Sequence, residues 1–151
     1  MAFKIALVFH LLGICNWFGA AGAQVFLLSA YKKGKDKEFV VWAEKMASAV
    51  TKSVELPGMI LAFLAGFALL FIGPRGLSIF SERWFIAKLF LVFCLALQTL
   101  YELSATGKIV RMREEGQSDE NLDLMKKKYL LWGKAVTLIA LGAFYFAVYK
   151  I

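Results

Sequence analysis

The sequence predicts an all-α membrane protein, a four-transmembrane-helix bundle, and two observations carry this prediction. The first is composition: 60% of the 151 residues are hydrophobic and the mean hydropathy is +0.66, whereas soluble domains are about 45–50% apolar. The second is run length. Residues 3–31, 84–103 and 129–150 are each apolar over the roughly 20 helical residues needed to cross a hydrocarbon core. A fourth run, residues 56–73, is shorter but has a helical lead-in. The expected organisation is one integral membrane domain over residues 1–151.

Basic residues gather in two connections and predict the orientation of the bundle. Six lysines lie between Lys32 and Glu55, and seven lysines or arginines lie between Ser104 and Lys134, out of 18 in the chain. Cytoplasmic loops of membrane proteins carry an excess of Lys and Arg. Both connections are therefore expected in the cytoplasm and both termini outside. This topology also explains the net charge of +7, so no nucleic-acid partner is expected.

Both cytoplasmic connections are expected to extend the spans as helices. Residues 38–55 place apolar side chains at helical spacing, which predicts an amphipathic helix that lies at the inner surface or extends the second span. Pro57 then suits a first helical turn or a kink. Residues 104–128 are expected to extend the third span to Glu115, break at Gly116 and restart near Ser118, which is a common helix-capping residue type.

His10 is the single histidine of the chain and lies well inside the first span. An ionisable side chain within the membrane is a functional-site hypothesis by default. At 100° per residue, His10 shares a helical face with Gly13, Trp17 and Gln24. Gly13 would let a planar group lie against the backbone, and a neutral imidazole is a common haem ligand. The alternative is that His10 forms a hydrogen bond with a neighbouring helix, and the residues alone leave both interpretations open.

Lys88 in the third span is expected close to His10 in depth. At about 1.5 Å per residue, His10 lies roughly 10 Å and Lys88 about 6 Å below the outer surface. Lys88 either extends to that surface or meets an anionic group such as a porphyrin propionate. Met59 lies near the inner end of the second span, roughly 15 Å from His10 in depth by the same rise, so the two cannot share one iron.

Polar residues of the third span fall on one stripe, which includes Thr99 and Glu102 and should point into the bundle. The second span presents Met59, Ala62 and Gly66 on one shallow face, which favours close helix packing. No HExxH, CxxC, GxSxG or phosphate-binding glycine loop occurs in the sequence. Intramembrane carboxylates are expected to be scarce, with Glu102 near a span end, which argues against a proton-coupled path.

Three stretches resemble a group of small bacterial membrane proteins that includes the membrane protoporphyrinogen oxidase HemJ and the copper-resistance protein CopD. The stretches are FHLLGICNWFGA, ELPGMILAFLAG and RWFIAKLFLV. They supply the histidine and tryptophan of span one, the proline heading span two, and the W-x-x-x-K that opens span three: His10, Trp17, Pro57, Trp84 and Lys88. The chain is closest in character to the uncharacterised members of this group.

This resemblance implies a haem b site in a bacterial inner-membrane protein. His10 would be an axial ligand of the haem iron, and Trp17 and Gly13 would lie beside the ring. Lys88 would lie near a propionate. If the chain is an enzyme, the implied reaction is oxidation of a porphyrin precursor, as in protoporphyrinogen oxidase. The HemJ-type stretch after span one and the later span-three histidine are replaced here by QVFLLSAYKKG and QTLYE, so the fold and His10 carry over better than the activity.

Two other functions fit the residues. One is a non-enzymatic membrane subunit or scaffold whose basic connections bind anionic lipid, a protein partner or a second copy of the chain. The other is transport of a metal ion or small solute through the bundle.

Overall fold

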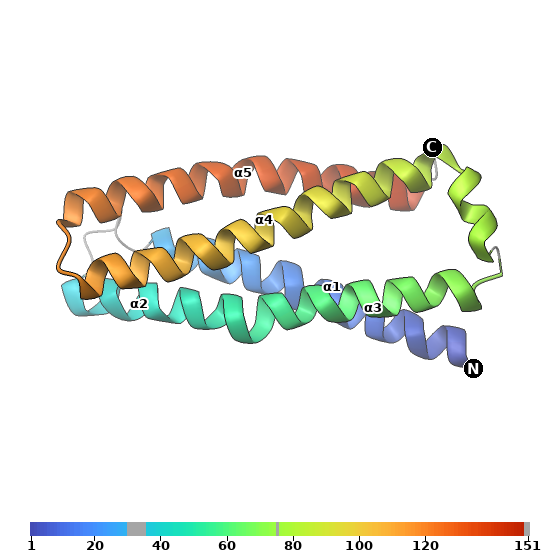
Figure 1. The fold of residues 1–151 in the computed structure, drawn as a ribbon, viewed down its shortest axis with the longest axis horizontal. Coiled ribbons are helices and arrows are strands. Elements are labelled where there is room, and N and C mark those ends of the chain that lie inside the picture. Colours follow the sequence, from blue (N-terminus) through green and yellow to red (C-terminus); the bar gives the residue numbers. More distant parts are fainter. Residues whose placement is uncertain (30–35, 75, 150–151) are drawn as a thin grey trace.

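The computed structural model describes residues 1–29, 36–74 and 76–149, and within these ranges every element of regular secondary structure is a helix (Figure 1). The first helix, α1, spans Ala2–Leu28. The next three elements are α2 (Lys37–Val50), the π-helical turn η2 (Thr51–Glu55) and α3 (Leu56–Ile72). A short 3-10 helix, η3 (Gly76–Ser81), leads to α4 (Arg83–Glu114) and α5 (Asp119–Tyr149). The all-α prediction is confirmed.

Three helices of the described chain are long and apolar enough to cross a membrane: α1, the continuous helix Lys37–Ile72, and α4. The membrane class predicted from composition is therefore supported. α5 is helical over residues 129–149 of the fourth predicted run. Residues 30–31 of the first predicted span, the turn up to residue 35, and residue 150 of the last span lie outside the described residues.

Large apolar side chains cover much of the outer surface of these helices. Examples are Leu64 and Phe67 on α3, Phe90 and Phe93 on α4, and Leu138 on α5, all more than half exposed. A soluble monomer rarely exposes contiguous apolar patches of large extent. This surface is the expected one for contact with lipid acyl chains.

The helices pack mainly as two pairs, α1 with α3 and α4 with α5, and α2 joins the pairs through its contacts with α1 and α4 (Figure 1). The start of α1 and the end of α5 lie at the same end of the bundle, and the α4–α5 turn lies at the other end (Figure 1). One buried cluster includes Ala47, Ile109 and Leu122, and a second includes Trp17 and Leu95.

Glycines allow α1 and α3 to approach backbone to backbone. A Cβ placed on Gly13 would lie 2.4 Å from the Ala62 nitrogen, and one on Gly58 would lie 2.8 Å from the Trp17 nitrogen. Both distances are far below van der Waals contact, so neither position accepts a side chain without a shift of the backbone. The shallow face predicted on the second span is used for helix packing.

The amphipathic segment predicted over residues 38–55 extends the second span as one continuous helix, Lys37–Ile72. Within it, the π-helical turn η2 precedes Pro57, and the Leu56 N–H donates to the Thr51 carbonyl five residues earlier. Proline lacks an N–H and its ring clashes with the carbonyl four residues before it, here that of Ser53. A local wide turn relieves this clash without ending the helix.

The turn between α4 and α5 follows the prediction closely. The Gln117 N–H donates to the Met112 carbonyl at 3.0 Å, and Gly116 has a φ of +72°, as in a Schellman-type helix end. The Ser118 Oγ accepts the Asn121 N–H at 3.4 Å and so caps α5. α4 therefore ends at Glu114, beside the predicted break at Gly116.

Candidate functional site

His10 lies between α1 and α3, and a hydrogen bond fixes its ring. The Nδ1 atom lies 2.7 Å from the Ala62 carbonyl oxygen, which can only accept, so Nδ1 carries the proton. The ring covers Gly66, where a Cβ would lie 2.9 Å from the His10 Cε1. Among the described residues, no hydrogen-bond partner is found for Nε2. His10 is thus held as the tautomer whose Nε2 lone pair is available.

Lys88 lies close enough to His10 for the two groups to interact electrostatically. This proximity agrees with the similar depths predicted for them. Lys88 is half-buried, and within the described part of the chain its ammonium has neither an ion-pair nor a hydrogen-bond partner. A half-buried cation normally finds an anionic or dipolar partner. The two residues together present one lone pair and one cationic donor on the same side of the bundle.

Trp17 and Gly13, the other predicted site residues, are buried between the helices. The Trp17 indole N–H donates to the Thr99 hydroxyl of α4 at 2.7 Å, and its ring stacks on Phe18 with centroids 5.3 Å apart. The space beside Gly13 is occupied by the backbone of α3 at Ala62. In this structure both residues hold α1 against its neighbours.

A buried polar network lies next to Trp17, on the side away from His10. Thr99, which accepts the Trp17 N–H, donates in turn to Glu55 Oε1 at 3.0 Å. The Gln24 amide donates to Glu55 Oε2, and the Tyr129 hydroxyl donates to Gln24 Oε1 at 2.7 Å. Side chains of α1, η2, α4 and α5 therefore meet at Glu55, which is 0% exposed.

Glu102 is the second carboxyl group of this network and interacts directly with Glu55. It is 4% exposed. Its Oε1 accepts a hydrogen bond from Gln98 at 3.1 Å. Its Oε2 is buried and has no hydrogen-bond partner among the described residues. Most buried polar atoms in proteins are paired, so this oxygen needs a physical explanation.

An ion cluster lies where α2, α4 and α5 meet, near the α4–α5 turn. Glu44 accepts from Arg113 at 2.9 and 3.0 Å and pairs with Lys126 at 2.7 Å. Burial acts to raise the pKa of Glu44, but the hydrogen bonds from Arg113 and Lys126 outweigh it and hold that pKa below its ordinary value. The hydrogen bond from Arg113 likewise lowers the pKa of Asp119.

The sequence predicts that Thr99 and Glu102 point into the bundle, as they do, but it does not predict the burial of Glu55. Glu55 lies in a segment predicted to be a cytoplasmic connection, yet both Glu55 and Glu102 are buried between the helices. Tyr129, the first residue of the fourth predicted span, is 1% exposed, and its hydroxyl donates a hydrogen bond to Gln24. The sequence feature that could have indicated the burial of Glu55 is its position directly before the apolar run of residues 56–73.

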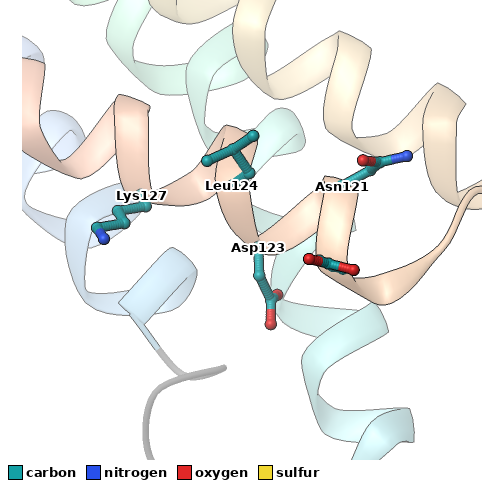
Figure 2. A pocket seen from close by; sticks show the side chains of 5 residues that line it. Asn121, Asp123, Leu124 and Lys127 are labelled. Carbon is teal, nitrogen blue, oxygen red and sulfur yellow. The ribbon is translucent and has the colours of Figure 1, made fainter.

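A surface hollow on α5 lies apart from His10 and from the buried network around Glu55. Figure 2 shows Asn121, Asp123, Leu124 and Lys127 around it, and Glu120 completes its lining. All five residues belong to one helix, so no second element encloses a ligand there. Among the described residues, no group of three or more His, Cys, Asp or Glu side chains is arranged to hold a metal ion.

Comparison with known proteins finds no matching family model, no matching curated protein and no matching solved structure.

Proposed function

We propose that this chain is a haem b-binding redox protein of the bacterial inner membrane, with His10 as an axial ligand of the iron. The observation that carries the proposal is the hydrogen bond from His10 Nδ1–H to the Ala62 carbonyl at 2.7 Å. Metal-binding histidines almost always donate their other ring N–H to a carbonyl or carboxylate, which fixes the ring and raises its basicity. The Nε2 atom of His10 has the lone pair that such a ligand needs.

The position of Lys88 near His10 supports the same proposal. An ammonium group near His10, without an ion-pair partner among the described residues, suits a propionate carboxylate. Trp17 and Gly13 then act by holding α1 in place, so that His10 keeps its position over Gly66. When bound, the haem would supply one-electron chemistry. The chain itself would orient the ligand and exclude water from it.

The proposed topology has four spans, with both termini outside and the two basic connections in the cytoplasm. The fourth span is α5 from residue 129 onward, and the end of α5 lies at the same end of the bundle as the start of α1 (Figure 1). The lysine and arginine counts of the connections support the orientation. An enzymatic role of the protoporphyrinogen oxidase type rests on the three matching stretches around His10, Pro57 and Lys88 alone.

The absorption spectrum of the purified protein tests haem binding. Protein expressed with a haem supply should show a Soret band, and His10→Ala should lose or shift it because Nε2 is gone. Asn16→Ala is the matched control, since Asn16 is an exposed polar residue on the same helix, and it should keep the band. A His10→Gly variant that regains the band when imidazole is added would separate lost ligation from lost folding. A wild-type protein without a Soret band would refute the proposal.

The oxidase activity has its own test. The gene should restore growth to a bacterial strain that lacks its protoporphyrinogen oxidase, and His10→Ala should not. Haem binding without such rescue would support a membrane haem subunit, which is the non-enzymatic alternative.

A further inference from the structure

Two carboxyl groups inside the bundle face each other without a cation between them. Glu55 on η2 and Glu102 on α4 interact directly and are 0% and 4% exposed. Neither forms an ion pair with a lysine or arginine of the described chain; Lys126, a buried ammonium on α5, pairs with Glu44 and Asp123. Among the side chains that the structure describes, no basic group therefore balances the charge of the pair.

Counting donors shows which oxygen lacks a partner. Glu55 accepts one hydrogen bond on each oxygen, from Thr99 and from Gln24. Glu102 Oε1 accepts one from Gln98. Glu102 Oε2 is buried with none. The network thus provides three donors for four carboxyl oxygens, and the single missing donor lies on the side of Glu102.

The energetic cost of burying two carboxylates together also favours one added proton, in agreement with the count of hydrogen-bond donors. Two ionised carboxylates in contact repel each other, and burial penalises each charge because the interior is far less polarisable than water. A buried acceptor without a donor adds the cost of its lost hydration. One proton removes both penalties, since it neutralises one carboxylate and supplies the missing donor.

We propose that Glu55 and Glu102 form a proton-binding site inside the bundle, in which Glu102 Oε2–H donates to the Glu55 carboxylate. The site is built by the wide turn η2, which places Thr51 and Glu55 inward just before Pro57. π-Helical turns of this kind occur frequently at functional sites. The proposal is independent of haem binding and stands without it.

The groups that face the pair from each packed element are uncharged or weakly acidic. Tyr129 of α5 interacts electrostatically with both carboxyl groups, and Tyr101 interacts with Tyr129. The remaining neighbours are amides and hydroxyls of α1, η2 and α4: Gln24, Thr51, Gln98, Thr99 and Thr106. Within this set of described side chains there is no Lys, Arg or His, so the proton is expected to stay on the pair.

Infrared spectroscopy of the protein in detergent tests the site. At pH 7 wild-type protein should show the C=O stretch of a protonated carboxyl group, shifted in D2O, although an ordinary glutamate with a pKa of about 4.3 is fully ionised there. Glu102→Gln should lose this band and keep the fold, because the introduced side-chain amide can donate to Glu55 as the proton does. Glu120→Gln, at an exposed carboxylate on α5, should leave the band unchanged.

Wild-type protein without a protonated-carboxyl band at pH 7 would overturn the proposal, whether or not Glu102→Gln folds. A band that persists in folded Glu102→Gln would place the proton elsewhere and overturn it too. Repeating the infrared measurement with sodium replaced by choline distinguishes a bound proton from a bound metal cation. An unchanged band supports a proton, and a band that appears after sodium is removed would mean that a metal cation occupies the pair instead.

Discussion

Removing the Glu44 carboxylate should strongly destabilise the end of the bundle at the α4–α5 turn. Glu44 is 2% exposed and is bonded to Arg113 and to Lys126, whose side chain is 1% exposed. Glu44→Ala leaves the Lys126 ammonium buried with Asp123 as an ion-pair partner at 3.0 Å. Asp123 is nearly half exposed and therefore compensates the lost charge only in part.

The magnitude follows from burial of the charges. Breaking a buried ion pair by removing one partner costs about 3–5 kcal/mol because the other charge is left uncompensated. Since Asp123 remains beside Lys126, the expected loss for Glu44→Ala is about 3 kcal/mol, at the low end of that range. Lys126→Met in the Glu44→Ala background should recover part of this loss, because the stranded charge is then removed.

Equilibrium unfolding in detergent, followed by helical circular dichroism, measures these differences. Lys37→Ala is the matched control. Its ion pair with Asp119 is 3.6 Å long and exposed, so its loss should cost less than about 1 kcal/mol. If Glu44→Ala costs no more than Lys37→Ala, or if Lys126→Met adds its full cost to that of Glu44→Ala, the cluster does not join the helices as described.

Further predictions concern pH, packing and topology. Because the pKa of Glu44 is lowered by folding, its contribution to stability is fully present above the ordinary value of 4.5 and is lost as the pH falls through the lower folded value; unfolding of Glu44→Ala should depend less on pH in that range. Gly13→Ala should cost at least about 1–3 kcal/mol through overpacking against α3, whereas Gly22→Ala, with open space around it, should not destabilise the protein. Trp17→Phe should cost about 1 kcal/mol for the lost bond to Thr99, seen in the same unfolding assay. A reporter enzyme that works only outside the cytoplasm should be active when it is fused after Tyr149. Activity of a reporter that works only in the cytoplasm, fused at the same point, would contradict the proposed orientation.

Much of the fold was predictable because hydrophobic run length and local turn chemistry act within short stretches. The break at Gly116 and the cap at Ser118 are local signals, and both appear where expected. The shallow face of the second span was also predictable, because small residues at helical spacing permit close approach. Its contact with α1 at Gly13 is the consequence.

The polar network was less predictable because it depends on which helices meet. Glu55 precedes Pro57 by two residues and follows a charged segment, so charge alone assigns it to the loop. Its burial arises because helix Lys37–Ile72 continues through the proline and turns residue 55 inward. Tyr129 similarly becomes a core residue only because α5 packs where it meets Gln24. Such long-range pairings leave no periodic signal in the sequence.

The haem content of purified wild-type protein tests the central claim most directly. Protein produced with sufficient haem and assayed as its pyridine haemochrome should contain one haem b per chain, and His10→Ala should contain little or none. Wild-type protein with a folded helical spectrum and no haem would contradict the claim that His10, held by Ala62 with its Nε2 free, is an iron ligand.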